Sequence, residues 1–464
     1  MSDLPEGWID CNLQDCVSVL DSLRIPVNSD ERKERQGNVP YYGATGQVGW
    51  IDDFLFDEEL LLIGEDGAPF FDKTKPISYI VRGKSWVNNH AHVLRALPEL
   101  TSNLYLKYFL DQFDFHEYVN GTTRLKLTQG SMNEIPVLLP PLNEQRRIVA
   151  KLEKLLGRVD AAQARLATIP RILKRFRQSV LAAACSGRLT ADWREANSTI
   201  EPASERLREL GAATIQDEGL NDLPASWEWC RFGDFVENHD GRRIPIESKE
   251  REKRKGAYPY YGASGIIDSI DGFTHDGSFL LIGEDGANLV ARSKPIAFLA
   301  KGRIWVNNHA HVVKCKSELP NEYLCHYINS IDLQPYVTGS AQPKLTQANM
   351  NKIPVPVAPL TEQQEIVRRV EALFKTADAL EVRYLTAKGH VDKLTQSILS
   401  RAFRGELVTI EAELARQEGR DYEPASVLLE RIRQERKQQQ ESTKLKANRT
   451  PRGKKDTATK KMFA

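Results

Sequence analysis

The chain has 464 residues, of which 41% are hydrophobic and 27% are charged, and its formal net charge at pH 7 is +1. This composition predicts an ordinary folded protein of about two to four domains, and the near-zero charge excludes a protein drawn to DNA or a membrane by its global field. No uncharged apolar run approaches the roughly 18 residues of a membrane span.

The N-terminal stretch MSDLPEGWIDCNLQDC has neither a basic segment nor an apolar core, so we expect no signal peptide. Six cysteines are scattered along the chain without a C-x-x-C pair: Cys11, Cys16, Cys185, Cys230, Cys315 and Cys325. This usage predicts reduced thiols in a cytoplasmic protein and argues against a zinc ribbon or a disulfide framework.

The chain contains a tandem repeat of one long sequence unit. YYGATG at Tyr41 returns as YYGASG at Tyr260, LLIGEDGA returns 219 residues later, and WVNNHAHV at Trp86 returns letter for letter at Trp305. Over residues 41–93 and 260–312, 29 of 53 positions are identical. Beyond them KLTQ at Lys126 returns at Lys344, and LPEGW near the start returns as LPASW. The period is too long for a solenoid, so each copy is a domain with its own following segment.

Each copy is followed by apolar residues at alternating steps of three and four, over residues 148–180 and 366–398. A seam sustained over more than four heptads predicts long coiled-coil helices, although two separate amphipathic helices remain an alternative. Pro170 is expected to kink the first helix because it removes a backbone donor. The predicted seam residues are Leu152, Leu155, Val159, Leu166, Ile169, Leu173, Val370, Leu373, Leu380, Tyr384, Val391 and Leu394.

A related segment follows each helix. Both segments contain EPAS, in which Ser204 or Ser426 could cap a short helix. The last 21 residues, KLKANRTPRGKKDTATKKMFA, are basic and poor in apolar side chains, so they are expected to be disordered.

The order of parts, and particularly the segments IPVLLPPLNEQRRIVAKLEKLL, IPRILKRFRQSVLAAACSGRLTADWR and IPVPVAPLTEQQEIVRRVEALF, resembles the specificity subunit of type I restriction–modification systems. The resemblance covers essentially the whole chain. It implies a non-catalytic subunit that recognises a bipartite DNA site with a fixed spacer. Its implied partners are double-stranded DNA, two adenine-N6 methyltransferase (modification) subunits and ATP-dependent restriction subunits. The resemblance also implies that the chain has no cofactor of its own. S-adenosylmethionine, ATP and Mg²⁺ are expected in the partner subunits.

The predicted fold class is α+β: two similar α/β target-recognition domains separated by two long helices, which form an antiparallel coiled coil with a pseudo-twofold axis. The predicted parts are domain 1 (1–147), the first helix (148–183), a linker with a short helix (184–222), domain 2 (223–365), the second helix (366–403) and the C-terminal short helix with its basic tail (404–464).

The similarity of the two domains predicts related half-sites. Duplex DNA has twofold symmetry, and half-sites one helical turn apart are separated by about 34 Å, a gap that the helices could set. Two similar domains related by a twofold should recognise similar sequences on opposite strands, which predicts a complete or near inverted repeat. Differences between Gln47–Trp50 and Ile266–Ser269, or between Pro69–Lys73 and Asn288–Arg292, could still make the half-sites unlike.

The WVNNHAHV motif allows three interpretations. The H-x-H spacing of a strand presents two imidazoles on one face, and with Glu65 they could hold a metal ion. The motif could instead be structural, with Trp86 and Val87 in the core, or its Asn and His side chains could contact DNA. IGEDGA is interpreted first as a turn that requires unusual backbone angles.

The basic stretches ERKER and KEREKRK lie at equivalent positions before the tyrosine pairs and suit phosphate contacts, although their glutamates also fit a solvated loop. Thr128 and Thr346 could alternatively cap helices. The candidate DNA-binding residues are Arg32, Lys33, Arg35, Tyr41, Tyr42, Asn88, Asn89, His90, His92, Lys126, Thr128, Gln129, Arg251, Lys253, Arg254, Lys255, Tyr260, Tyr261, Asn307, Asn308, His309, His311, Lys344, Thr346 and Gln347.

The chain lacks the sequence motifs expected of an adenine methyltransferase, a phosphate-loop enzyme or a serine hydrolase. It has no Asn/Asp-Pro-Pro-aromatic tetrapeptide of an adenine methyltransferase, no G-x-x-x-x-G-K-[ST] phosphate loop and no G-x-S-x-G elbow. No catalytic residue and no metal ligand is therefore assigned. The alternative function is a stand-alone bivalent DNA-binding regulator, which would bind tightly alone with a steep salt dependence.

Overall fold

The protein is described from a computed structural model, which describes residues 4–72, 75–216, 219–316, 319–339 and 341–449. The chain forms two compact units. Unit 1 comprises Met1–Leu166 together with Ala387–Ala464, and unit 2 comprises Ala167–Thr386. Each unit contains one repeat and part of each long helical region, so the duplication in the sequence is also a duplication in the fold.

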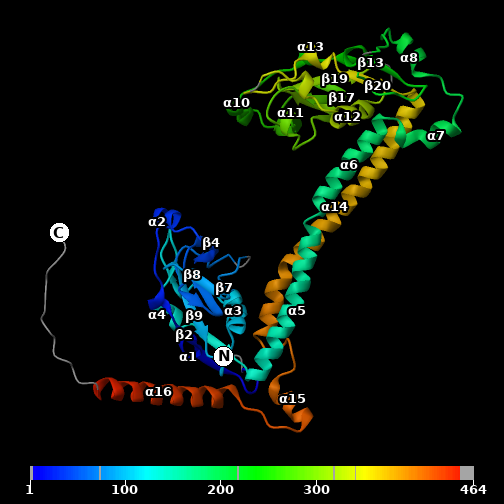
Figure 1. Cartoon of the computed structure of the whole chain (residues 1–464). Coiled ribbons are helices and arrows are strands. Elements are labelled where there is room, and N and C mark those ends of the chain that lie inside the picture. Colours follow the sequence, from blue (N-terminus) through cyan, green and yellow to red (C-terminus); the bar gives the residue numbers. More distant parts are fainter. Residues whose placement is uncertain (1–3, 73–74, 217–218, 317–318, 340, 450–464) are drawn as a thin grey trace, which may run out of the picture. The chain divides into compact units, whose positions relative to one another are not determined.

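Domain 1 is built from three small antiparallel assemblies and a fourth mixed one (Figure 1). The outer pair is β1 (Ile9–Asn12) with β12 (Pro136–Leu139), and a short pair joins β10 (Val119–Asn120) to β11 (Lys126–Leu127). The first four-stranded sheet has the order β2 (Val17–Val19), β9 (Ala91–Ala96), β6 (Leu60–Gly64) and β7 (Ser78–Val81). The second has the order β4 (Gly46–Ile51), β3 (Val39–Gly43), β8 (Lys84–Val87) and β5 (Phe56–Asp57). The helical elements are α1 (Leu13–Cys16), η1 (Asp21–Leu23), α2 (Ser29–Glu34), α3 (Asn103–Gln112) and α4 (Gln129–Asn133).

Domain 2 repeats this plan with its main strands joined into one sheet. The outer pair is β13 (Glu228–Arg231) with β20 (Pro354–Val357). The six-stranded sheet has the order β14 (Val236–Asn238), β19 (Ala310–Cys315), β17 (His275–Gly283), β18 (Ala297–Val306), β15 (Tyr258–Gly262) and β16 (Gly265–Ile270). The helical elements are α9 (Phe232–Phe235), η3 (Asp240–Arg242), α10 (Ser248–Lys253), α11 (Asn288–Ala291), α12 (Asn321–Ser330), η4 (Gln334–Tyr336) and α13 (Gln347–Met350).

A glycine lies within the long strand β17 of domain 2, at the position where domain 1 has a break between two strands. Gly277 lies in the middle of β17 with φ +140°, a backbone conformation that glycine adopts without a steric penalty. Glu58 occupies the equivalent position in domain 1, where the strand is interrupted between β5 and β6.

The two repeated motifs of the sequence lie side by side in both domains. In domain 1, β3 and β8 pair in parallel, with Tyr41 opposite Trp86. In domain 2, β15 and β18 pair in the same way, with Tyr260 opposite Trp305. All four aromatic residues are buried, which confirms that the tryptophan and the first tyrosine of each motif belong to the core.

The helical segments are α5 (Leu142–Leu166), α6 (Ile169–Cys185) and α14 (Leu360–Ala402). The predicted kink at Pro170 is replaced by a break: α5 ends before it, and α6 begins with the proline in its first turn. The difference has a simple cause, because the first turn is where a residue without an N–H costs no helical hydrogen bond. The 43 residues of α14 form one helix of about 65 Å.

Within each unit the helices pair antiparallel, as predicted. In unit 1, α5 packs on the C-terminal part of α14, with Leu152 and Leu399 in one core. In unit 2, Arg177 of α6 donates to Asp378 and Glu381 of α14 at 2.7 and 2.8 Å. Leu152, Val159, Leu173 and Val370 are buried at the seam. Leu380 and Leu394 are 47% and 43% exposed, so neither is a buried seam position.

The segments after the helices form η2 (Arg188–Thr190), α7 (Ala191–Ala196), α8 (Ala203–Glu209), α15 (Glu411–Glu418) and α16 (Ala425–Arg449). The predicted serine caps are wrong. α8 begins at Ala203 with Pro202 as its cap, and α16 begins at Ala425, so Ser204 and Ser426 lie inside the first turn. The start of the tail predicted to be disordered is helical through Arg449, and residues 450–464 lie outside the described residues.

A buried glutamate fixes the base of the helix in each unit. Glu144 of α5 accepts from Trp8 Nε1 at 2.9 Å and from the backbone N of Glu411 at 2.7 Å. Glu362 of α14 accepts from Trp227 Nε1 at 2.8 Å and from the Thr190 hydroxyl at 2.6 Å. The segment after each helix therefore docks onto the domain of its own unit.

Candidate nucleic-acid interface

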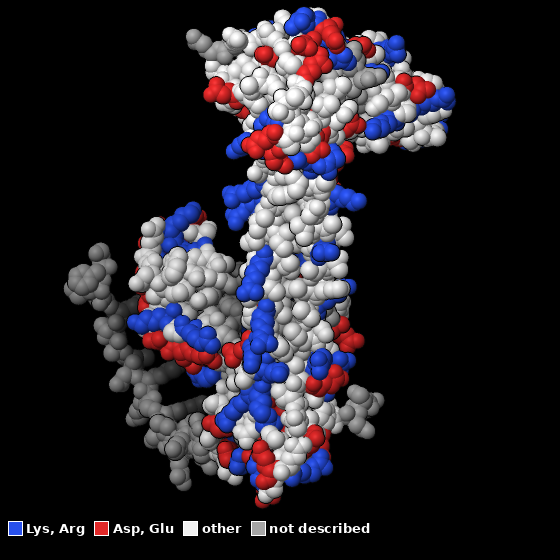
Figure 2. Space-filling view, turned by 90° about the vertical axis from the view of Figure 1, so that its right-hand side faces the viewer, with Lys and Arg blue, Asp and Glu red and all other residues white. Residues whose placement is uncertain are grey.

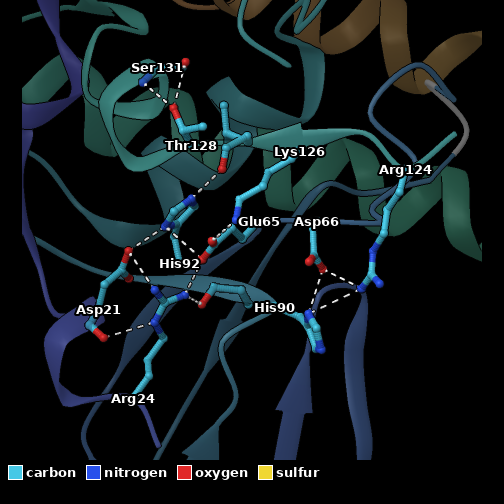
Figure 3. A network of polar contacts seen from close by, with 12 residues as sticks. Asp21, Arg24, Glu65, Asp66, His90, His92, Arg124, Lys126, Thr128 and Ser131 are labelled. Atoms are coloured by element: carbon cyan, nitrogen blue, oxygen red, sulfur yellow. Dashed lines mark hydrogen bonds and ion pairs between the residues drawn. The ribbon is translucent and has the colours of Figure 1, made fainter. Parts of the chain in front are cut away.

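The loops of domain 1 converge on a network of charged side chains (Figure 3). Its inner part, called here the buried network, consists in domain 1 of Asp21, Arg24, Glu65, His92 and Lys126, and in domain 2 of Asp240, Arg243, Glu284, His311 and Lys344. In domain 1, Asp21 lies in η1, Arg24 follows it, Glu65 follows β6, His92 lies in β9 and Lys126 lies in β11. In domain 2, Asp240 lies in η3, Arg243 follows it, Glu284 follows β17, His311 lies in β19 and Lys344 precedes α13. Four segments far apart in the sequence are thus tied together.

His92 is the centre of the network in domain 1 and is 1% exposed. Its Nδ1 lies 2.5 Å from Asp21 Oδ2, and its Nε2 lies 2.9 Å from the backbone oxygen of Leu127. A carboxylate and a carbonyl oxygen both accept hydrogen bonds, so each ring nitrogen faces an acceptor. His311 makes the same two bonds in domain 2, to Asp240 at 2.6 Å and to the oxygen of Leu345 at 2.8 Å. Both ring nitrogens of each histidine are therefore engaged by oxygen atoms of the chain.

Arg24 and Lys126 complete the charge balance in domain 1. Arg24 Nη1 lies 2.7 Å from Glu65 Oε2 and its Nη2 lies 3.4 Å from Asp21 Oδ2, while Lys126 Nζ lies 3.2 Å from Glu65 Oε1. Arg24 also donates to the backbone oxygen of Ala91 at 2.7 Å. The two carboxylates are thus shared among Arg24, Lys126 and His92, which satisfies carboxylate charges that would be costly to bury alone.

In domain 2, the network lowers the pKa of both of its carboxyl groups. Burial alone would raise the pKa of Asp240, but the bonds from His311 and the backbone N of Val312 bring that pKa below its ordinary value. The pKa of Glu284 is likewise lowered, because Arg243, His311 and Lys344 outweigh the effect of its burial. Both groups are carboxylates at neutral pH.

The H-x-H motif brings an aspartate, a glutamate and a histidine together in each domain, with ligand-type atoms within 4.8 Å of one another. The chemistry of these donors does not suit a metal ion. Both nitrogens of His92 already face oxygen atoms of the chain, and the carboxylates already contact Arg24 and Lys126. The arrangement supports the structural interpretation of this histidine.

The other histidine of each motif lies at the surface. His90 is bonded through Nδ1 to Asp66 at 2.7 Å, and Arg124 Nη2 lies 2.9 Å from the same carboxylate. The side chain of Arg124 is 62% exposed. In domain 2, His309 contacts Asp285 at 2.8 Å, and an exposed glutamine, Gln342, stands where domain 1 has Arg124.

Several predicted DNA-binding residues have protein partners inside the fold. Tyr41 donates to the oxygen of Val27 at 3.0 Å, and Asn88 accepts from the backbone N of His90 at 2.8 Å. Thr128 and Thr346 cap α4 and α13, as the alternative interpretation held. The buried candidates are Tyr41, Asn88, His92, Tyr260, Tyr261, Asn307 and His311.

The arginines of the two basic stretches pack on aromatic rings. Arg35 lies over the ring of Trp86 and 2.8 Å from Asp52, and Arg254 does the same with Trp305 and Asp271. The predicted residues that remain exposed are Lys33, Asn89, Lys126, Gln129, Lys253, Lys255, Asn308, His309, Lys344 and Gln347, while Arg32, Arg35, Tyr42, His90, Arg251 and Arg254 are partly exposed.

Sequence reasoning missed two members of each network. Asp21 and Arg24 in DSLR correspond to Asp240 and Arg243 in DGRR, again 219 residues apart. The signal was present in the repeat itself, because an Asp-x-x-Arg pair recurs at the same offset as the other motifs. The pair lies outside residues 41–93 and 260–312, where the two copies are most alike, and for that reason it was not recognised as a motif.

The long helices carry basic side chains of their own (Figure 2). On α6, Arg171, Lys174 and Arg175 are exposed, whereas Arg177 is paired with the acidic residues of α14. These cations lie outside the networks and offer a separate surface for a polyanion or an acidic partner.

Residues 5–171 and 224–385 match the family model described as the type I restriction modification DNA specificity domain. The chain is 29% identical to the type I restriction enzyme EcoDI specificity subunit of Escherichia coli over 93% of this chain and 96% of that protein. It is 33% identical to the StySPI specificity subunit of Salmonella potsdam over the same shares of the two chains.

Two solved structures share the fold. A chain from a study of complex assembly and conformational transition in the type I R-M system has a TM-score of 0.62 at 17% identity, with 88% of this chain and all of that chain covered. The HsdS subunit from Thermoanaerobacter tengcongensis has a TM-score of 0.52 at 18% identity, with 87% and 98% covered. Among the described residues, no helix is long and apolar enough to cross a membrane.

Proposed function

Because the chain belongs to the type I restriction modification DNA specificity family, we propose that it recognises a bipartite DNA site, one half-site with each domain, and positions the modification and restriction subunits there. The observation that carries this proposal is that both domains have the same charged network and the same kinds of side chain at the surface beside it. Each domain holds a charged network whose lysine, Lys126 or Lys344, reaches the surface, where it lies with His90 in domain 1 and His309 in domain 2.

The proposed role of the exposed cations is to contact phosphates. Lys126 and Lys344 are each about half exposed, and each keeps one side on a network glutamate. A lysine held in this way has a fixed position and still presents its ammonium group to a polyanion. Phosphate contacts of this kind fix the orientation of a protein on duplex DNA, whereas base contacts provide the discrimination.

The proposed partners are double-stranded DNA, two adenine-N6 methyltransferase subunits and ATP-dependent restriction subunits. S-adenosylmethionine, ATP and Mg²⁺ would bind to those partners, and this chain would contribute no catalytic group. Its best-placed titratable residues support that assignment, because His92 and His311 have both nitrogens engaged and their carboxylate neighbours are neutralised. Family membership favours this function over a stand-alone regulator.

The similarity of the two networks supports related half-sites. The same five residue types make the same contacts in both domains, so the backbone that carries the exposed residues is held alike. Two domains that present similar surfaces to opposite strands would recognise a site close to an inverted repeat.

The direct test is a single-molecule map of modified bases in the native genome, with and without the gene for this chain. We expect N6-methyladenine to disappear from one bipartite motif when the gene is deleted. An unchanged map in a strain whose modification subunits are expressed would contradict the proposed function, and tight binding by the isolated chain would then favour the regulator.

A salt titration tests the phosphate contacts. In the assembled complex, Lys126→Met and Lys344→Met should weaken binding to all sequences, and each should reduce the slope of log K against log salt by about 1, because one fewer phosphate is neutralised. A change in the methylated motif itself would instead show that these lysines contact bases.

A further inference from the structure

Each domain exposes apolar side chains on one hairpin, called here the reading hairpin: β3–β4 (Val39–Ile51) in domain 1 and β15–β16 (Tyr258–Ile270) in domain 2. Val48 and Trp50 are 49% and 55% exposed, and Ile266 and Ile267 are 62% and 54% exposed. β4 and β16 are also edge strands of their sheets. Exposed apolar groups on an edge strand favour unwanted pairing unless a partner covers them.

A β-bulge accounts for this exposure in both hairpins. Tyr41 pairs with Gly49 and Tyr42 pairs with Gln47, so Val48 is the extra residue of the strand. The same shift in domain 2 makes Ile267 the extra residue. A bulge bends the strand and redirects side chains, which is why positions 47 and 48 of one strand are both exposed.

The hairpin is packed closely against the loops above the buried network. A Cβ on Gly64 would lie 2.9 Å from the backbone oxygen of Ala44, at the hairpin turn, and a Cβ on Gly43 would lie 3.3 Å from Asn88 Nδ2 and from Val48. In domain 2, a Cβ on Gly283 would lie 2.7 Å from the oxygen of Ala263. The exposed residues are therefore carried on a fixed backbone, as recognition of a rigid ligand requires.

Basic residues lie beside the apolar ones. Arg32 of α2 lies over the ring of Tyr41 and next to Gly49, with no carboxylate in ion-pair contact within the described part of the chain. Lys84 lies over the ring of Phe54, and Arg303 lies over the ring of Phe273 at the equivalent place in domain 2. Cations around an apolar two-stranded ribbon suit duplex DNA, whose major groove admits such a ribbon between two phosphate backbones.

The two hairpins differ where they are exposed. Gln47, Gly49 and Trp50 in domain 1 correspond to Ile266, Asp268 and Ser269 in domain 2. Asp268 also changes the charge, because it pairs with Arg251 at 3.2 Å and with Lys255, whereas Gly49 offers no carboxylate to Arg32. The buried networks are the same in both domains, so these positions are where a difference in base preference can arise.

We propose that the reading hairpins enter the major groove and that residues 47 and 50 in domain 1, and 266 and 269 in domain 2, determine the base preference of their half-sites. The inference rests on the proposed function and deepens it. The Gln47 amide can pair with the N6 and N7 edge of adenine, whereas Ile266 offers only apolar contact, which suits the methyl group of thymine. The two half-sites then differ at the base pair that faces these positions and remain related elsewhere.

The test transplants one hairpin into the other domain in the full chain, assembled with its modification subunits. The graft is Gln47→Ile, Val48→Ile, Gly49→Asp and Trp50→Ser, and methylated sites are mapped before and after. We expect the half-site of domain 1 to acquire the preference of the domain 2 half-site at one or two base pairs, by about 5- to 150-fold, with the other half-site unchanged. The reverse graft at residues 266–269 should change only the half-site of domain 2.

The segment between β7 and β8 offers a matched control. Arg82 in domain 1 corresponds to Lys301 in domain 2, so exchanging them keeps the charge. The single substitution Arg82→Lys should leave the motif unchanged. An unchanged motif in the grafted complex would overturn the inference while leaving the proposed function intact, because the wild-type map tests that function separately.

If the graft abolishes methylation, the single substitution Gln47→Ile decides the question. Binding of the assembled complex to oligonucleotides with a randomised half-site gives the base preference without the need for methylation. A changed preference at one base pair supports the hairpin as the recognition element. The wild-type preference at every position would overturn it.

Discussion

The buried network and the reading hairpin show opposite relations between the two repeats. The network keeps the same five residue types and the same contacts in both domains, whereas the hairpin beside it changes three of the four residues at 47–50 in character. The hairpin's bulge is nevertheless the same in both. The comparison indicates that the network holds the backbone in the same position in both domains. The side chains on the hairpin can then differ without a change in that backbone.

The largest effect should come from breaking the network. Asp21→Ala removes the carboxylate that holds His92, Arg24 and the backbone N of Val93. It leaves buried polar groups, His92 Nδ1 and the backbone N of Val93, without their acceptor and removes one of the two carboxylates of Arg24, so we expect unfolding to become easier by about 3–5 kcal/mol, as measured by chemical denaturation of the full chain. Asp30→Ala, in a solvent-exposed pair with Lys33, is the control and should change little. Equal midpoints for Asp21→Ala and wild type would show that the network does not support the fold.

A pH titration should give an intermediate effect. The pKa of Asp240 and that of Glu284 are lowered in the folded protein. As the pH falls through the ordinary carboxyl range, about pH 4, these two groups therefore bind protons in the unfolded chain before they do so in the folded one. The stabilisation from these groups is fully present above that range and is lost as the pH falls through their folded-state pKa values. The stability difference between wild type and Asp240→Asn should therefore shrink from pH 6 to pH 3, and a constant difference would contradict this account.

The smallest effect should come from the hairpin. Trp50→Ser replaces an exposed side chain with the one that domain 2 carries, so the free energy of unfolding should change by less than about 0.5 kcal/mol. Thermal melting of the full chain measures it, with Trp86→Ser, a buried position, as the contrasting variant. A large loss of stability with Trp50→Ser would show that this side chain belongs to the core.

The repeat and the heptads were sufficient to predict two α/β domains and antiparallel long helices, because both patterns are local in sequence. The break at Pro170 could not be distinguished from a kink, since both relieve the same missing N–H. The network could be predicted only in part. The sequence placed His92 in a cluster, but its partner Asp21 lies 71 residues away, and only the pairing of β9 with its neighbours brings them together.

The candidate interface was harder to predict than the fold for a physical reason. Tyr41 and Trp50 are both aromatic residues of one hairpin, yet the first is 1% exposed and the second is 55% exposed. Strand alternation alone would not place residues 47 and 48 both at the surface, and the bulge that does so leaves no clear mark in the sequence. Basic residues were found easily, but their burial against aromatic rings was not.

The composition of unit 1 has a consequence for how the protein is made. Its core contains Leu399, Phe403 and Leu429 alongside residues of domain 1, and the backbone N of Ala425 donates to the oxygen of Gly7. Unit 2 is a continuous stretch of chain and can fold as soon as it leaves the ribosome. Unit 1 must wait until nearly the whole chain has been synthesised, so the domain translated first is the one completed last. A truncated transcript would thus yield one finished unit and one with an open core, which favours its removal by chaperones and proteases.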